Sequence, residues 1–419
     1  MFRDDLQAAR RIILENHPGP VDALNPGFGK CLNAGFEQQM ALVESIDTAD
    51  AYLYALLKFV GGFRDGRLGI RFDVDRGPAR WPGFFTTWRN GMVVIHTIDP
   101  ALVPELAEGD RLQSCDGQNA EQLVRQRVFD FQFDPALPAN WVPAAARAFV
   151  DLGNPFVGVP MQCVFVRQDR EIVHDLEWRE ISWDERRDDY SAARGRTRPE
   201  IGLYVPEPDV YLFAEALWDE SPDNVEKDLE FVERRVSEGN IAYWETVPSI
   251  IRTQFGDSHS AVGWSQHVRR NLEASLKDSR DLWRETPVDG DQKPEDASTA
   301  KKSNPVTPKY RGTVAVLTDT TCGSACLDAM SLLTEIREVV HVGSLTAADT
   351  QYMEARPAPL PSGLATLGIP IKVYRGRVRP DGGYFTPAFQ YEGLHWTDEA
   401  LRAWVLSLWR EGELEANEH

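Results

Sequence analysis

The sequence predicts a mixed α/β protein, and three patterns along its 419 residues support that fold class. Apolar residues recur at helical spacing over residues 1–60, and short strand-like runs occupy residues 81–185. Between residues 201 and 376, strand-like and helix-like segments alternate, which indicates an α/β core whose strands bring their loops to one edge. A chain of this length is expected to form two or three domains, and the patterns divide it into a helical region at 1–75, a β-rich region at 76–200 and the core at 201–419.

Composition narrows the class of protein. Hydrophobic residues make up 42% of the chain, with 12 Trp and 19 Phe, which is enough to fill globular cores. The formal net charge of −20 opposes binding to nucleic acid or to an anionic membrane. No run of about 18 apolar residues predicts a membrane-inserted helix, and the first residues lack the apolar segment of an export signal. We therefore expect a cytoplasmic protein; the sequence does not specify an oligomeric state.

The cysteines predict unpaired thiols and no metal site. They are few, scattered and odd in number, which fits a reducing compartment better than a disulfide framework. None of them forms a Cys/His pattern with zinc-ligand spacing. The five are Cys31, Cys115, Cys163, Cys322 and Cys326.

In the N-terminal region we expect two or three helices, interrupted at residues 17–27 by prolines and glycines. His17 precedes Pro18 and is expected to be a structural turn residue. Asp65-Gly66 is a strong turn signal before an alternating strand, and Arg67 lies at the exit of that turn.

In the β-rich region the patterns predict three strands and one helix. A Gly-Asp before the second strand and an Asp-Gly after it give residues 107–117 the shape of a PDZ-like turn. Residues 185–200 are rich in Asp and Arg and are predicted to be a solvated linker. The expected strands are Met92–Ile95, Arg111–Ser114 and Val159–Val166, and the expected helix is Ala120–Phe129.

The core is predicted to contain alternating strands and helices and one long polar insertion at residues 285–309. Its expected strands are 210–214, 247–252, 314–317, 339–342, 352–354 and 371–374. Its expected helices are 224–238, 264–276, 325–336 and 397–409.

Ser324 stands out because it follows a buried strand and a tight turn and immediately precedes a helix. A helix N-terminus offers free N–H groups and a favourable dipole, which a serine nucleophile and its oxyanion both need. A serine that only caps the helix has the same local pattern. The flanking sequence must decide between these two interpretations.

The flanking sequence resembles the C-terminal-processing (tail-specific) serine peptidases, a family that includes the tricorn core protease and the interphotoreceptor retinoid-binding protein repeats. The resemblance is strongest in Tyr310–Thr313, Gly323–Asp328, Val342–Thr346, Leu360–Gly363 and Lys372–Arg377, and it is looser over the rest of the chain.

The resemblance implies a ββα core of the ClpP/crotonase type and peptide-bond hydrolysis without a metal or organic cofactor. It implies that Ser324 is the nucleophile, with Gly323, Ala325 and Gly256 as candidate oxyanion donors. Arg67 and Asp349 are candidate substrate contacts. The substrate would be a peptide or a small acyl compound.

The chain departs from the family at three places. Where dyad members have a lysine, this chain reads Ala347-Ala348-Asp349; where other members have a histidine, it has Arg67. An arginine cannot act as a general base at ordinary pH. The usual glycine-rich oxyanion loop is replaced by residues 255–260, which contain the single glycine Gly256.

A serine hydroxyl needs a neighbouring base to become a good nucleophile. His259 is the candidate base, because it lies in a loop expected to face Ser324 and titrates near neutrality; the alternative is a loop histidine bonded to Asp257 or to solvent. Asp349 and Glu354 either orient a base or bind a substrate amine, or are ordinary polar residues. Asp328 is expected on the helix surface, and Cys322 and Cys326 either supply a thiol nucleophile or pack as small hydrophobes.

Three functions remain open on the sequence. The first is a serine peptidase or related acyl hydrolase that uses Ser324 with a non-standard base. The second is a pseudo-peptidase that binds peptides or serves as a scaffold, and the third is an enzyme of the same fold acting on a small acyl or amide substrate. We further expect Arg67 and the PDZ-like region to hold a substrate carboxylate.

Overall fold

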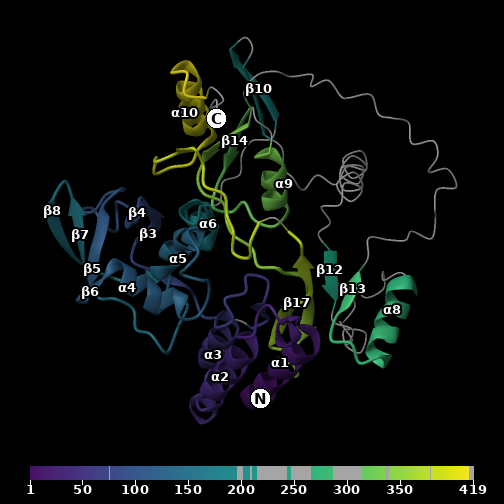
Figure 1. Ribbon diagram of the computed structural model, residues 1–419. Coiled ribbons are helices and arrows are strands. Elements are labelled where there is room, and N and C mark those ends of the chain that lie inside the picture. Colours follow the sequence, from purple (N-terminus) through teal and green to yellow (C-terminus); the bar gives the residue numbers. More distant parts are fainter. Residues whose placement is uncertain are drawn as a thin grey trace, which may run out of the picture.

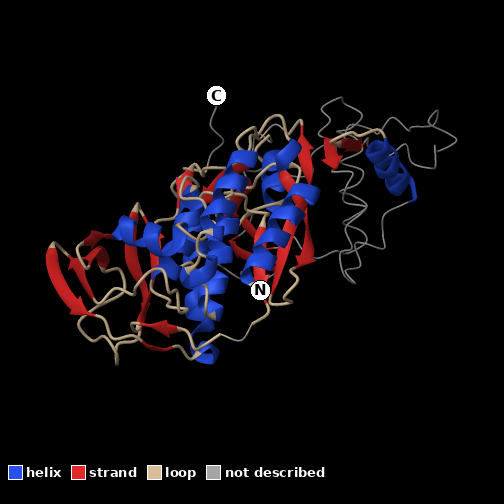
Figure 2. Ribbon diagram, turned by 90° about the horizontal axis from the view of Figure 1, so that it is seen from below, coloured by secondary structure: helices blue, strands red, loops and turns tan. Residues whose placement is uncertain are grey.

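The computed structural model describes residues 1–74, 76–195, 202–207, 210–214, 243–246, 266–285, 314–335, 339–377 and 379–414. Helices and strands both contribute extensively, which confirms the α/β class. Figure 2 shows most of the helices gathered in the middle of the described part, with strands to either side.

The predicted N-terminal helical layer is present. It consists of α1 (Phe2–Asn16), α2 (Phe28–Met40) and α3 (Ala49–Gly61), joined through the 3₁₀ turns η1 (Gly19–Val21) and η2 (Val43–Ser45). Thr48 caps α3 by accepting a hydrogen bond from the Ala51 N–H. In α1 the side chains of Leu6, Ala9 and Ile13 follow helical spacing and are fully buried.

These helices pack on a five-stranded sheet that combines both ends of the chain. Its strand order is β1 (Gly69–Phe72), β17 (Ala365–Arg375), β12 (Tyr243–Thr246) and β13 (Trp283–Glu285), and β16 (Tyr352–Pro359) also pairs with β17. Helix α8 (Gln266–Lys277) lies between β12 and β13 in the chain. β17 extends from beside α1 toward α9 (Figure 1).

The β-rich region forms a six-stranded antiparallel sheet backed by helices. The strands predicted at Met92–Ile95 and Arg111–Ser114 are confirmed. The sheet contains β3 (Phe84–Arg89), β4 (Met92–Ile98), β5 (Arg111–Cys115), β6 (Gln118–Asn119), β7 (Gln162–Arg167) and β8 (Arg170–Asp175). The helical segments are α4 (Ala120–Val124), the π-helical η3 (Arg125–Phe129), the 3₁₀ turn η4 (Pro138–Asn140) and α5 (Trp141–Ala148), while β2 (Arg80–Trp81) pairs separately with β9 (Arg179–Glu180).

The prediction of a solvated linker at residues 185–200 is wrong for the first half of that range, because α6 (Trp183–Ala193) occupies it. Tyr190 packs against the buried Phe85 of β3, with 5.3 Å between the ring centroids. Arg186 forms an ion pair of 2.5 Å with Asp99. The many charged residues in this stretch predicted a solvated segment. Its aromatic side chains instead fix its position, because they bury apolar surface against the sheet.

The Ser324 segment lies in a parallel three-stranded sheet of β14 (Val314–Thr318), β15 (Val339–Gly343) and β18 (Phe389–Gln390). Helix α9 (Ala325–Leu333) follows β14 as predicted and stands beside it in Figure 1. The C-terminal helix α10 (Asp398–Arg410) begins after Thr397, which caps it. The hairpin of β10 (Gly202–Glu207) and β11 (Val210–Ala214) forms a separate two-stranded sheet.

The expectation of unpaired thiols is wrong for four of the five cysteines. Cys115 and Cys163 lie directly opposite each other on β5 and β7 and form a disulfide. Cys322 and Cys326 form a second disulfide across the start of α9, and Cys31 is free. Spacing along the chain does not reveal either pairing, because strand register and helix geometry bring the sulfur atoms together.

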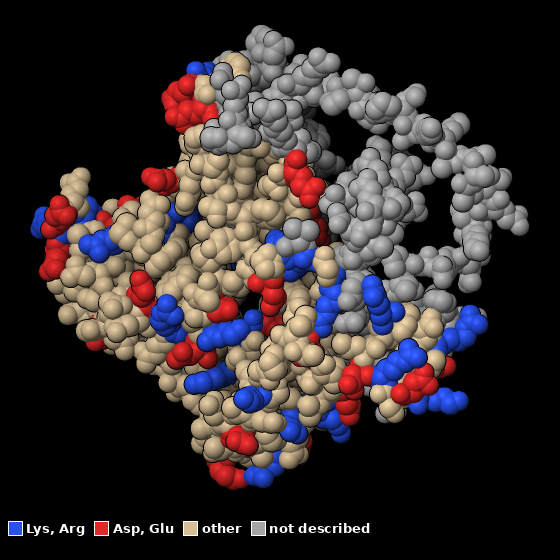
Figure 3. Space-filling view, in the orientation of Figure 1, with Lys and Arg blue, Asp and Glu red and all other residues tan. Residues whose placement is uncertain are grey.

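Some predicted features lie outside the described residues: the helix at 224–238, the strand at 247–252, the loop at 253–260 and most of the insertion at 285–309. No helix in the described part of the chain is long and apolar enough to cross a membrane. On the face shown in Figure 3, acidic and basic side chains are interspersed over the described surface, without a broad basic area.

Candidate functional site

Ser324 lies at the N-terminal end of α9 in a conformation that is unusual for a residue with a side chain. Its backbone has φ 57° and ψ −121°, a region that costs of order 1–3 kcal/mol for a non-glycine residue. The turn leading to it is shaped by Asp319, whose carboxylate accepts hydrogen bonds from the N–H and the hydroxyl of Thr321. The chain thus holds the serine in a strained turn between β14 and α9.

The Ser324 hydroxyl and three backbone N–H groups at this turn have no hydrogen-bond partner in the described part of the chain. Ser324 does not cap α9 with its side chain, and its hydroxyl has no hydrogen-bond partner among the residues that the structure describes. The N–H groups of Gly323, Ser324 and Ala325 likewise have no acceptor within that part of the chain. They precede the first hydrogen-bonded turn of α9, where a helix stabilises negative charge.

The Cys322–Cys326 disulfide brackets Ser324. It ties the last residues of the turn to the first turn of α9, so that the five-residue segment becomes a closed ring. Closing a ring of five residues stabilises the folded state by about 2 kcal/mol on the chain-entropy estimate. This is the same order of magnitude as the backbone strain at Ser324.

The loop after β15 lies against the Ser324 turn. Gly343 has φ 105°, and a Cβ atom there would lie 2.4 Å from the Thr318 carbonyl oxygen, so this position requires glycine. The Ser344 N–H donates to the same oxygen at 2.8 Å. Further along the loop, Ala347 is close to Gly323, because a Cβ atom built on that glycine would lie 3.5 Å from the Ala347 Cβ.

Asp349, a candidate substrate contact, lies in a buried ion-pair network next to this loop. Its Oδ1 accepts hydrogen bonds from Arg377 at 2.9 Å and from Arg379 at 2.6 Å. Arg379 also donates to Asp328, one turn into α9, at 3.1 Å. Burial raises the pKa of the Asp328 carboxyl above its ordinary value, although Arg379 acts in the opposite direction. Asp349 and Asp328 therefore connect the loop after β15, the segment after β17 and the start of α9.

The Asp65-Gly66-Arg67 turn meets the far end of the same loop. Thr350 donates its hydroxyl proton to Asp65 Oδ1 at 2.9 Å, and the Arg67 N–H donates to that oxygen at 2.8 Å. The Arg67 side chain is half-buried, and its guanidinium has no partner among the described residues. The loop at residues 343–350 thus contains Asp349, lies beside Gly323, and is bonded through Thr350 to the turn that contains Arg67.

Two buried histidines near this loop are engaged in structural contacts. The Nδ1 atom of His17 accepts the Gly19 N–H at 2.8 Å, and Nε2 lies 2.9 Å from Asp65 Oδ2, which confirms the expected turn role. His341 lies on β15 with Nε2 2.7 Å from the Thr318 hydroxyl oxygen. Burial lowers the pKa of His341, which favours the neutral form of its ring. His259 and Gly256 lie outside the described residues.

Sequence reasoning assigned no role to Arg377 and Arg379. The N–H groups at Arg377 Nη2 and Arg379 Nε are buried without a hydrogen-bond partner within the described part of the chain. The available signal was their place directly after a strand of the α/β core, where loops gather at one edge. No group of three or more His, Cys, Asp or Glu side chains that could hold a metal occurs among the described residues.

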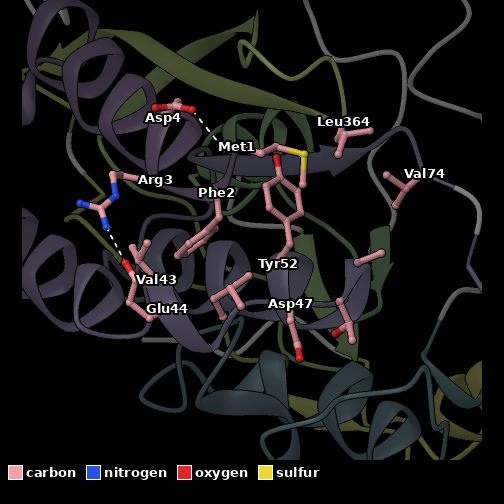
Figure 4. Close-up of a pocket in the computed structure, with 13 residues that line it drawn as sticks. Met1, Phe2, Arg3, Asp4, Val43, Glu44, Asp47, Tyr52, Val74 and Leu364 are labelled. Carbon is pink, nitrogen blue, oxygen red and sulfur yellow. Dashed lines mark hydrogen bonds and ion pairs between the residues drawn. The ribbon is translucent and has the colours of Figure 1, made fainter.

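A separate pocket lies at the N-terminal helices (Figure 4). It has a volume of about 450 Å³ and is lined by residues of α1, by the segment before α3 and by Leu364. Arg3 and Glu44 form an ion pair at its rim, and Tyr52 reaches it from α3. None of the residues around Ser324 lines this pocket.

The comparisons with known proteins identify a fold. The sequence matches no protein-family model and no curated protein. Among solved structures, mature CPAF is similar over 99% of this chain and 96% of its own, with 12% sequence identity and a TM-score of 0.55. The chain shares the CPAF fold. Mature CPAF complexed with lactacystin gives 12% identity and a TM-score of 0.56, over 99% of this chain and 98% of that one.

The photosystem II D1 C-terminal processing protease covers 94% of this chain and 93% of its own at 11% identity, but its TM-score of 0.33 is too low to carry an argument. At such identities a structural likeness establishes the fold alone. At the level of the fold alone, the resemblance to C-terminal-processing serine peptidases that the sequence predicted is confirmed.

Proposed function

We propose that this protein is a serine peptidase-like hydrolase that cleaves peptide or related acyl and amide bonds through Ser324. One observation carries the proposal: at the start of α9, neither the hydroxyl of the strained Ser324 nor the N–H groups of residues 323–325 have a hydrogen-bond partner within the described part of the chain. A nucleophile and an oxyanion site need this arrangement. CPAF is a serine protease, and the shared fold supports the proposal of peptidase chemistry for this chain.

In the proposed reaction the Ser324 hydroxyl attacks the substrate carbonyl and gives up its proton to a base. The N–H groups of Ser324 and Ala325, with that of Gly323, then stabilise the negative oxygen of the tetrahedral intermediate. His259 remains the proposed base, and Gly256 a proposed further donor. The reaction as proposed uses no metal or organic cofactor.

Labelling with a fluorophosphonate tests the nucleophile. We expect wild-type protein to label at Ser324 and the Ser324→Ala variant not to label, because the reactive oxygen is gone. Ser331→Ala is a matched control on the same helix, since the Ser331 hydroxyl donates to the Leu327 carbonyl and should not react. A His259→Ala variant that labels at the wild-type rate would remove His259 as the base.

Arg67 is proposed to bind a substrate carboxylate, since its half-buried guanidinium is unpaired within the described structure. We expect Arg67→Ala to weaken binding of a peptide with a free C-terminus about tenfold, as loss of one charge-assisted hydrogen bond predicts. Calorimetry with the free and the C-terminally amidated peptide measures this difference. Arg71→Ala is the control, because Arg71 is exposed and pairs with Asp73. Equal affinities of wild type and Arg67→Ala for the free peptide would exclude the role.

We also propose a ClpP/crotonase-like core, a PDZ-like region and a cytoplasmic location for this protein. The parallel β14–β15 pair with α9 supports a ClpP/crotonase-like core, and the six-stranded sheet with α4 and α5 supports a PDZ-like region. The divisions at residues 75 and 200 are proposed as sequence regions. The two disulfides weigh against the proposed cytoplasmic location, because such bonds persist mainly in oxidising compartments.

The second candidate function is a pseudo-peptidase that binds peptides or serves as a scaffold. It is favoured by the lack of any hydrogen-bonded base at the Ser324 hydroxyl among the described residues. Absence of labelling, together with retained peptide binding, would select it. A repurposed acyl or amide enzyme would instead label at Ser324 and hydrolyse small esters but not peptides.

A further inference from the structure

We propose that the Cys322–Cys326 disulfide is a reversible redox-modification site whose opening by a dithiol reductant loosens the Ser324 turn. This proposal rests on the proposed function in so far as it concerns reactivity at Ser324. Its structural part, the loosening of the turn, can be measured independently of any catalysis.

The disulfide is well placed for this role because its two cysteines flank Ser324 in the sequence. Cys322 lies two residues before the serine and Cys326 two residues after it, in the first turn of α9. The serine between them has φ 57°, a conformation that a residue with a side chain leaves readily when it is not constrained. The bond therefore closes a small ring around Ser324, whose strained backbone conformation has to be maintained.

A reductant can reach this bond. Cys322 is buried at 7% exposure, whereas Cys326 is half-buried and its neighbour Ala325 is exposed. Thr321, on the other side of the ring, is exposed as well. We therefore expect a thiolate to reach the disulfide from the Cys326 side.

The other disulfide provides an internal contrast. Cys115 and Cys163 are 1% and 0% exposed and lie within the core behind the six-stranded sheet. Because exchange requires access for the attacking thiolate, a mild reductant should open Cys322–Cys326 first. The molecule would then keep its sheet while the turn alone changes.

The chemical step is thiol–disulfide exchange with a dithiol. One thiolate attacks the Sγ of Cys326 and forms a mixed disulfide, and the Cys322 sulfur leaves as a thiolate. The second thiolate of the reductant then attacks its own sulfur in the mixed disulfide and releases Cys326. In total the protein gains two electrons and two protons, and the dithiol is oxidised to a disulfide.

Opening the ring should act locally, because α9 has a second attachment. Arg379 still holds Asp328 and Asp349 after the bond is broken. The helix is expected to stay in place while residues 322–326 gain conformational freedom. Ser324 then spends less time in the geometry that directs its hydroxyl at the carbon, and the N–H groups at the oxygen, of one substrate carbonyl group.

The experiment treats the full-length protein with dithiothreitol at a concentration that opens one disulfide, as shown by alkylation and peptide mass mapping. We expect alkylation at Cys322 and Cys326 before Cys115 and Cys163. Fluorophosphonate labelling at Ser324 should slow about tenfold and recover on reoxidation. Amide exchange in the peptide that covers residues 319–333 should become faster.

The controls separate the two disulfides and the two proposals. Cys322→Ser/Cys326→Ser should label slowly and ignore the reductant, while Cys115→Val/Cys163→Val should keep the wild-type sensitivity. If the mass spectra show the bond open while exchange stays unchanged, the proposal is overturned. If the oxidised protein never labels but exchange still rises on reduction, the redox site stands and the nucleophile fails.

Discussion

His96 of β4 is a buried residue whose ionisation links stability to pH. Its side chain is 3% exposed, and Nδ1 lies 2.7 Å from the Thr97 hydroxyl oxygen. Burial lowers the pKa of His96 to about 3, and the nearby His395 and Arg89 act in the same direction. The folded protein thus holds this ring neutral at pH values where the unfolded chain protonates it.

The sign of the effect follows from that depressed pKa. Above the unfolded pKa of about 6.5, His96 does not lower the free energy of unfolding. As the pH falls from there toward the folded pKa, the free energy of unfolding decreases, because the unfolded chain gains a proton on His96 that the folded protein does not bind. Between pH 8 and pH 5 His96 should cost about 2 kcal/mol of unfolding free energy. Urea denaturation of wild type and His96→Gln at both pH values measures it. An equal loss of stability in the two proteins would contradict the assignment.

Individual residues also mark how far the sequence could define the site. Ser324 was identified because a small turn between a strand and a helix is a local pattern. The surroundings of the turn could be predicted only in part, since Ala347 lies beside Gly323 and Arg379 pairs with Asp328 through chain reversals that no local pattern encodes. The glycine at Gly343 was recognised by resemblance, and the structure gives the reason: there is no room for a Cβ atom beside the Thr318 carbonyl.

At the scale of elements, the β14–turn–α9 unit is held by ion pairs from outside it. Arg379 and Asp349 have side chains that are both 5% exposed, and Arg379 connects them to Asp328 on α9. Removing one partner of a buried pair leaves an uncompensated charge, which is far more costly than losing an exposed pair.

We therefore expect Arg379→Met to lower the unfolding free energy by roughly 3 kcal/mol and to slow labelling at Ser324. The exposed Arg71 is the matched control, with Arg71→Met expected to cost less than about 1 kcal/mol. Chemical denaturation and labelling rates give the two readouts. If both variants are equally stable, Arg379 does not hold α9.

β17 shows why some strands were only partly predicted. The sequence pointed to 371–374, but the strand runs over Ala365–Arg375 and contains Pro370, which usually argues against a strand with neighbours on both sides. On one side β17 pairs with β1 at residues 365–368 and with β12 at 372–375, so Pro370 lies in the interval between these partners. Only the three-dimensional pairing removes the conflict.

At the scale of the whole molecule, the two ends of the chain share one hydrophobic core. That core contains Leu6 and Leu56 from the N-terminal helices and Leu367 and Ile371 from β17, all fully buried. The helical region and the five-stranded sheet thus bury each other's apolar surface. Neither of them would form this core without the other.

Leu6→Ala should accordingly destabilise the sheet as well as α1, by about 3 kcal/mol. Leu24→Ala is the control and should change stability by less than about 0.5 kcal/mol, because Leu24 is 74% exposed. Far-ultraviolet circular dichroism and tryptophan fluorescence should report the same transition in Leu6→Ala. Two separate transitions, with β-sheet structure retained after α1 unfolds, would show that the N-terminal helices are independent.

The sequence by itself determined the α/β class, the N-terminal helices, the β14–α9 unit and the place of Ser324, because period, capping and turn chemistry act over a few residues. The tertiary structure decided the two disulfides, the position of α6, the Asp349–Arg379–Asp328 network and the shared core. These depend on strand register and on burial between distant segments, which fix distances that spacing along the chain does not contain.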